Sequence, residues 1–280
     1  NTTVRQSGNT GLFTSNNVSL PDFSQNTFTE NEVPVSIPAI LMGALDSETA
    51  FTGNTNDQIL AREQTITQDM TISSLDVPYR VLENNYIEEA AQVTINPGAT
   101  LEFAADAGLS IYSDDAALIA EGTAEEKITF TGVEQSSGFW MGISFDSDNP
   151  NNSLANAIVE YAGSTPGQYF DHSANIGITN GSEISLANTI VRNGKSYGLF
   201  AQSGARFADF GSNSFTGNNV GIAIPTPLIG TIDKGTTISA NDKHYVRVLD
   251  EAVNTDMTVA STERPFRIQA RPTIREDAMV

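Results

Sequence analysis

Short apolar runs separated by turn-forming residues dominate the hydrophobic pattern of the chain. Many of the runs last only three to five residues, and Gly, Asn, Asp or Pro stands between them. Helical periodicity is scarce, and few of the breaks are two-residue hairpin turns. The pattern predicts an all-β fold, more typical of a parallel β-helix than of a sandwich of longer antiparallel strands. The predicted strands include residues 93–103, 109–112, 118–120, 127–131, 140–145, 157–161, 176–179 and 184–191.

The sequence matches itself when position 1 is aligned with position 188. Without a gap, 31 of the 93 overlapping positions are identical, as in NTFTENEVPVSIP at 26–38 and NSFTGNNVGIAIP at 213–225. We call residues 1–93 the first copy, 188–280 the second copy, and 94–187, which occurs once, the unpaired half-module. Two residues that this alignment places together are counterparts. Internal repetition at this scale predicts an array of stacked units.

The repeat predicts about one and a half modules of a tandem array. The expected divisions are 1–66, the end of a first module, 67–253, a complete module, and 254–280, the start of a third. Val280 aligns with Val93, which continues into the unpaired half-module, so we expect a processed or excised piece of a longer precursor. A duplication inside a complete protein is the alternative.

A finer spacing recurs among the asparagines. The interval from Asn188 to Asn213 equals the interval from Asn193 to Asn218. One β-helix coil takes roughly this length of chain, and each coil covers the apolar face of its neighbour. Asparagine tolerates a left-handed turn and can pass side-chain hydrogen bonds between coils. These four residues therefore predict a structural ladder.

The order of motifs in the chain resembles a known group. TINPGATLEF (94–103), LIAEGTAEEKITFTG (118–132), WMGISF (140–145) and AIVEYAG (157–163) are similar to exported bacterial surface proteins with right-handed parallel β-helix repeats. The resemblance covers about 94–224 and extends to 1–38 through the internal repeat. It implies a right-handed β-solenoid and an extracellular or cell-surface location, but no particular activity.

Composition and charge disfavour nucleic acid and membranes as partners. The chain has no cysteine and carries 34 acidic against 14 basic residues, a formal net charge of −20. Such a surface repels nucleic acid and anionic lipid, and no stretch of 18 apolar residues could span a membrane. The absence of cysteine is compatible with export. Within this acidic chain, a local basic run near the C-terminus is expected to form a solvated strand face or ion pairs between modules, and docking on an acidic neighbouring module is the sharper alternative: Arg264, Arg267, Arg271 and Arg275.

Metal and catalytic signals are weak. Residues 146–152, DSDNPNN, supply hard oxygen donors at loop spacing, as calcium prefers, but lack the central Gly and the downstream Glu of an EF-hand loop. Calcium is the one cofactor that the sequence suggests, and a solvated turn is the alternative. No paired carboxylates suited to glycoside hydrolysis are evident, so a polysaccharide lyase or hydrolase is the less favoured interpretation. The candidate ligands are Asp146, Asp148, Asn149 and Asn151.

Carbohydrate binding is a further alternative. Trp140, the single tryptophan, could offer a platform to a sugar ring, although a role at the end of a strand against a neighbouring coil is favoured. The segment 163–173, GSTPGQYFDHS, is longer than neighbouring turns and carries Tyr169 and Phe170. Binding residues concentrate on such loops. Surface glycans are therefore candidate partners.

The sequence favours a structural or adhesive role over catalysis. The expected object is a segment of a large exported, repetitive bacterial surface or filament protein that stacks end to end. Its partners would be copies of itself or neighbouring modules of the same precursor. Negative charge would keep a long extracellular rod soluble.

Overall fold

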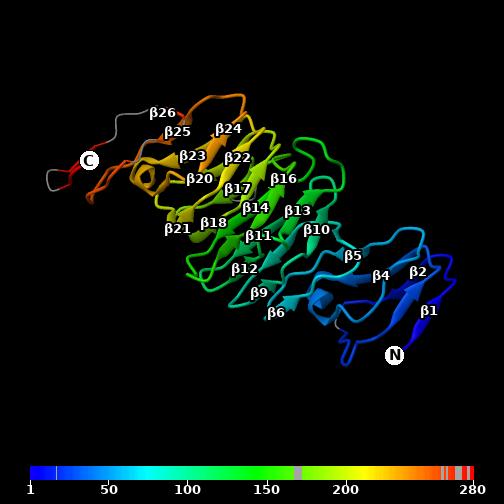
Figure 1. The fold of residues 1–280 in the computed structure, drawn as a ribbon. Coiled ribbons are helices and arrows are strands. Elements are labelled where there is room, and N and C mark those ends of the chain that lie inside the picture. Colours follow the sequence, from blue (N-terminus) through cyan, green and yellow to red (C-terminus); the bar gives the residue numbers. More distant parts are fainter. Residues whose placement is uncertain (17, 167–171, 260–261, 263, 269–272, 276–277) are drawn as a thin grey trace.

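A computed structural model describes residues 1–280 except 17, 167–171, 260–261, 263, 269–272 and 276–277 (Figure 1). It is all-β apart from two short 3-10 helices, η1 (Ala39–Ala44) and η2 (Thr226–Thr231). Every strand pairing among the described residues is parallel. The parallel architecture predicted from the sequence is therefore confirmed, and it is consistent with a β-solenoid.

Three long sheets and one short sheet make up the described strands, and most successive strands pass from one sheet to another (Figure 1). In spatial order, the ten-stranded sheet contains β2 (Thr10–Phe13), β4 (Val33–Pro38), β5 (Ile59–Arg62), β7 (Tyr79–Val81), β10 (Thr100–Phe103), β13 (Ile128–Gly132), β16 (Ala157–Glu160), β19 (Ile190–Arg192), β22 (Ser214–Thr216) and β24 (Thr237–Ser239). The eight-stranded sheet contains β8 (Asn85–Ile87), β11 (Gly108–Tyr112), β14 (Gly142–Asp146), β17 (Ala174–Ile178), β20 (Tyr197–Ala201), β23 (Val220–Pro225), β25 (Val246–Leu249) and β26 (Phe266–Ile268). The six-stranded sheet contains β6 (Met70–Ile72), β9 (Gln92–Ile95), β12 (Ala117–Glu121), β15 (Ser153–Ala155), β18 (Glu183–Ala187) and β21 (Arg206–Gly211), and β1 (Thr3–Arg5) pairs with β3 (Thr27–Thr29).

Turn residues divide two of the predicted strands. The segment 93–103 forms β9 and β10, because Pro97 and Gly98 turn the chain between them and Gly98 has φ +83°. The segment 184–191 forms β18 and β19, because Asn188 takes a left-handed conformation with φ +51°. Both breaks follow from residues that tolerate positive φ.

Alternating side chains of the three sheets fill one continuous apolar core. Many strands bury one face more fully than the other, as in β10, where Leu101 and Phe103 point inward, whereas β4, β17, β20 and β23 are buried at every position. Aromatic rings stack between successive coils, with centroids of Phe28 and Phe51 5.7 Å apart. Each coil thus covers the apolar face of the next.

The two copies place counterpart strands in different sheets. Strands β2, β4, β5 and β7 of the first copy lie in the ten-stranded sheet, whereas their counterparts β20, β23, β25 and β26 lie in the eight-stranded sheet. The pairing of β7 with β10 carries the first set on into the ten-stranded sheet. The solenoid therefore shifts by one face between the first copy and the second, and η1 and η2 pack against β6 and β21 at the ends of the six-stranded sheet.

No helix in the described part of the chain is long and apolar enough to cross a membrane.

Candidate functional site

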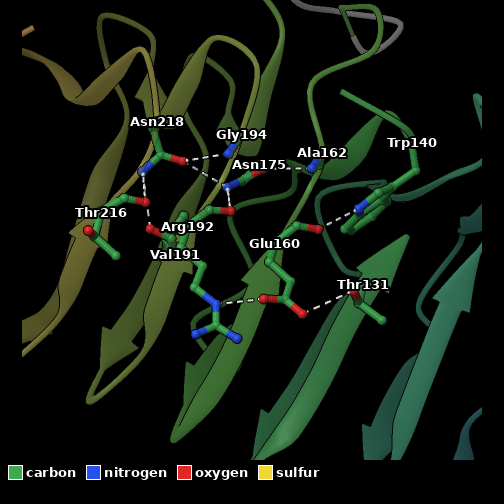
Figure 2. Close-up of polar contacts among 10 residues, drawn as sticks. All are labelled: Thr131, Trp140, Glu160, Ala162, Asn175, Val191, Arg192, Gly194, Thr216 and Asn218. Carbon is green, nitrogen blue, oxygen red and sulfur yellow. Dashed lines mark hydrogen bonds and ion pairs between the residues drawn. The ribbon is translucent and has the colours of Figure 1, made fainter. Parts of the chain in front are cut away.

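A ladder of buried asparagines joins successive coils in the second copy (Figure 2). Asn218 accepts hydrogen bonds from the backbone N–H of Gly194 (2.9 Å) and from Nδ2 of Asn175 (3.2 Å). Its own Nδ2 donates to the carbonyl oxygen of Val191 (3.1 Å) and to Oδ1 of Asn241 (3.2 Å). Asn218 is 1% exposed, so these bonds satisfy backbone groups that water cannot reach.

Asn175 enters this ladder from a strand. A Cβ on Gly194 would lie 2.7 Å from Oδ1 of Asn175, so the side chain of Asn175 needs a glycine at that position. Asn175 accepts from the backbone N–H of Ala162 and donates to the carbonyl oxygen of Arg192. The glycine therefore leaves a ladder position empty, and Asn175 fills it.

The first copy contains the counterpart ladder. Asn31 accepts from the backbone N–H of Ser7 (3.1 Å) and donates to the carbonyl oxygen of Val4 (3.1 Å), as Asn218 does with Gly194 and Val191. Asn54 receives the bond from Asn31, as Asn241 does from Asn218. The same donor and acceptor pattern thus recurs in both copies.

A second polar column runs beside the ladder. The backbone N–H of Thr189 donates to Oδ1 of Asn213 (3.0 Å), whose own N–H donates to Oγ1 of Thr236 (3.2 Å). The counterparts Thr2, Asn26 and Thr49 repeat these two bonds at 3.0 and 3.2 Å.

The four predicted ladder asparagines divide into two kinds. Asn213 and Asn218 are buried and carry side-chain bonds between coils. Asn188 and Asn193 instead occupy left-handed turns, with φ +51° and +57°. Sequence reasoning missed Asn31, Asn54, Asn175 and Asn241. The identity of Asn54 with its counterpart Asn241 was a usable signal, whereas Asn175 has no spacing signal because Gly194 stands at its ladder position.

A charged row follows the outward face of the ten-stranded sheet (Figure 2). Glu160 is 6% exposed and accepts bonds from Nε of Arg192 (2.6 Å) and from the hydroxyl of Thr131 (3.1 Å). Farther along the row, Nη2 of Arg80 contacts Oε2 of Glu102 at 2.9 Å. Register pairs Arg80 with Glu102, Glu102 with Thr131, and Glu160 with Arg192.

The two glutamates of this row are held apart. The strand of Thr131 lies between them, so their backbones are about 9.6 Å apart at two strand spacings. Both oxygens of Glu160 already accept hydrogen bonds, from Arg192 and Thr131. The ion pair and the hydrogen bond of Glu160 therefore hold neighbouring strands together.

Trp140 lies inside the solenoid. It is 0% exposed, stacks on Phe103 with ring centroids 4.1 Å apart, and donates from Nε1 to the carbonyl oxygen of Glu160 (2.8 Å) (Figure 2). An isolated parallel bridge joins it to Ala162 of the next coil. Its ring is buried and therefore offers no face to a sugar.

The segment suggested for glycans is only partly described. Tyr169 and Phe170 lie outside the described residues. His172 packs on the outer face of the eight-stranded sheet, with its ring centroid 4.6 Å from that of Phe200 and 5.5 Å from that of Tyr197. A small cavity of about 20 Å³ beside His172 is lined by Ser110 and Ser144, among other residues. Its volume is enough for one water molecule.

Side chains of the DSDNPNN loop form hydrogen bonds within the loop and to residues outside it. Asn149 donates from Nδ2 to the carbonyl oxygen of Asp115 (2.7 Å) and accepts from the backbone N–H of Asn151 (3.0 Å). Asn151 donates to Gln92 (3.1 Å), and Asp146 accepts from the hydroxyl of Thr179. Oδ1 of Asn149 and the carboxylate of Asp146 therefore already accept hydrogen bonds, and Asp148 belongs to the same loop. Within the described residues, no group of three or more His, Asp or Glu side chains is placed to hold a metal ion.

The basic run is spread over the C-terminal edge. Arg264 donates from Nε to the carbonyl oxygen of Ile238 (3.0 Å), and the guanidinium of Arg267 lies 4.9 Å from the ring centroid of Tyr245. Arg275 is exposed, and Arg271 lies outside the described residues.

Asp233 fixes the turn that follows η2. Its partial burial alone would raise the pKa, but the Thr236 hydroxyl and the backbone N–H groups of Ser212 and Gly235 donate to the carboxylate. These hydrogen bonds prevail and hold the pKa of Asp233 below its usual value.

No family model, curated protein or solved structure matches the chain.

Proposed function

We propose that the chain is a structural segment of a large exported, repetitive bacterial surface protein. Right-handed β-helix modules, each made of one copy and one half-module of the 94–187 kind, stack end to end in this protein and form a stiff, acidic, extracellular rod. The chain spans about one and a half such modules, and neighbouring modules of the same precursor are its partners.

The observation that carries the proposal is the passage of one copy into the next. Backbone pairing of β7 with β10 joins the first copy to the unpaired half-module without a break in the sheet. Because β26 is the counterpart of β7, the second copy contains a strand suited to the same connection. A junction that recurs in this way can extend a solenoid without adding a new kind of interface.

The polar contacts between coils support a load-carrying role. The asparagine ladders and the outward ion pairs join each coil to its neighbours, so that separation of coils would expose several unpaired groups at once. The net charge of −20 would keep an extended rod soluble and would disfavour lateral association.

The length of a module can be measured. Seven strand-to-strand steps separate β2 from β19 in the ten-stranded sheet, and β19 is followed by β20, the counterpart of β2. At about 4.8 Å a step, one repeat adds about 34 Å.

The test is a chain extended after Val280 by a second copy of its own residues 94–280. The proposal predicts that small-angle scattering shows a maximum dimension larger by about 34 Å, with an unchanged cross-section. An extended chain that is unfolded in the added part, or that forms two compact bodies with a wider cross-section, would contradict it.

A further inference from the structure

Two edge arginines have counterparts that are paired inside the solenoid. Arg5 lies on β1 and Arg267 on β26, and both are exposed. The ion pairs among the described residues are Arg80–Glu102, Arg192–Glu160 and Arg206–Glu183, and none includes Arg5 or Arg267. Their counterparts, Arg192 and Arg80, do have carboxylate partners.

The paired counterparts show what an edge strand meets when another strand follows it. Arg192 contacts Glu160 of β16 at 2.6 Å, and Arg80 contacts Glu102 of β10 at 2.9 Å. In each case the glutamate lies directly opposite the arginine in the parallel register. Both glutamates belong to the unpaired half-module.

The apolar side chains of the edges show the same difference. Phe13 of β2 is 62% exposed, whereas its counterpart Phe200 is 5% exposed beneath the ring of His172. Ile268 of β26 is 51% exposed, whereas its counterpart Val81 is 2% exposed and lies opposite Phe103 of β10. The edges therefore present apolar surface that residues of the unpaired half-module cover elsewhere in this chain.

The C-terminal edge also carries an unbalanced charge. Arg267 lies directly opposite Arg247 of β25, whereas in the first copy Arg80 lies opposite Leu60. Like charges opposite each other on neighbouring strands destabilise the pair. A carboxylate on the next strand would relieve this repulsion.

We infer that each edge of the solenoid is a docking surface for a β-helix half-module of the 94–187 kind, selected by a glutamate opposite the edge arginine. The occupant is a further half-module in the same polypeptide. A half-module that follows the chain places its equivalent of Glu102 opposite Arg267. A half-module that precedes the chain places its equivalent of Glu160 opposite Arg5. This inference rests on the proposed stacking function and assigns the chemistry of its junctions.

The distribution of charge fits this assignment. The unpaired half-module carries 13 acidic residues and one basic residue, whereas the second copy carries 9 acidic and 10 basic residues. Their formal charges are therefore −12 and +1, so a further half-module at the C-terminal edge would place acidic surface beside a nearly neutral copy, whereas the first copy, with 12 acidic and 3 basic residues, carries −9. Direct contact between the second copy and another first copy would bring no strand with a glutamate at these registers.

The test uses the full chain extended after Val280 by a second copy of residues 94–187. Hydrogen exchange reports on the amides of β26. The inference predicts that the extension raises their protection about tenfold or more. Reversal of the added copy of Glu102 to Arg removes most of this gain, and Arg267→Glu in the same molecule restores it. The control is reversal of the added copy of Glu121 to Arg, at an exposed position that does not face Arg267. This change leaves the protection of β26 unchanged.

The outcomes separate this inference from the rod proposal. If the extended chain lengthens but the Glu102 reversal has no effect, the rod stands and the arginine–glutamate assignment is wrong. If the unextended chain forms end-to-end oligomers in analytical ultracentrifugation that Arg267→Glu abolishes, a second copy is the occupant and the inference is overturned. Should the added segment fail to fold, residues 94–187 placed before Asn1 test the other edge. The added segment should cover Phe13, so the exchange of the β2 amides should become slower. Reversal of the added copy of Glu160 to Arg should then remove this protection. An unchanged exchange rate in either case overturns the inference.

Discussion

Replacement of Asn218 by alanine should measure the strength of the asparagine ladder. The substitution removes the acceptor for the backbone N–H of Gly194 and the donor to the carbonyl oxygen of Val191. It also breaks the link to Asn175 and one of the two bonds to Asn241, whose Oδ1 still accepts from the backbone N–H of residue 218. A buried group left unpaired costs about 1–3 kcal/mol, and each other lost bond contributes about 0.5–1.5 kcal/mol. With allowance for water entering the gap, we expect a loss of about 3 kcal/mol in the free energy of unfolding.

Urea denaturation followed by circular dichroism provides the assay, with hydrogen exchange at Gly194 as a local reporter. The matched control is Asn180→Ala, at an exposed turn, where a change within about 0.5 kcal/mol is expected. If Asn218→Ala and the control fall together within that margin, and exchange at Gly194 stays slow, the ladder contributes no more than an ordinary surface residue and the reasoning fails.

Three further predictions concern single residues. Asp233 has a lowered pKa in the folded state, so its stabilising contribution is present above the ordinary pKa and is lost as pH falls through the folded value; Asp233→Asn should flatten the stability profile of acid unfolding, and an unchanged profile would count against this. Trp140→Ala should cost about 3–5 kcal/mol and Trp140→Phe less, and acrylamide should quench wild-type tryptophan fluorescence only weakly; ready quenching would show an exposed ring. Glu160→Gln should destabilise the chain by about 1–3 kcal/mol, more than Glu102→Gln in the more exposed pair, and a reversed order in urea denaturation would show that burial does not set the strength of the row.

The sequence contained the strands but not their assignment to sheets. Asn, Gly and Pro breaks predicted short parallel strands, and the internal repeat predicted which strands correspond. The shift by one face could not be read from the pattern, because strands such as β7 and β26 have similar apolar sequences yet lie in different sheets. Sheet membership depends on which strand follows, and this is a long-range property.

The site residues were predictable where a role depends on local conformation. Turn-forming Asn188 and Asn193 follow from the tolerance of asparagine for positive φ. The pairing of Glu160 with Arg192 links positions 32 residues apart, and neither spacing nor charge pattern marks it. The partners of Asn149 and Asn151 are likewise set by neighbouring coils, so the spacing of residues within the loop does not indicate them.

The shift of one face is tested most directly by disulfide trapping, because the chain has no cysteine of its own. Arg80 and Glu102 lie opposite each other on parallel strands, at a spacing of about 4.8 Å that a disulfide can span. We expect a chain with Arg80→Cys and Glu102→Cys to oxidise readily to a monomeric disulfide, whereas a chain with Arg80→Cys and Ser110→Cys, on the eight-stranded sheet, should not. Rapid oxidation of the second pair and none of the first would show that the strands of the first copy continue into the eight-stranded sheet, and it would rule out the shift by one face.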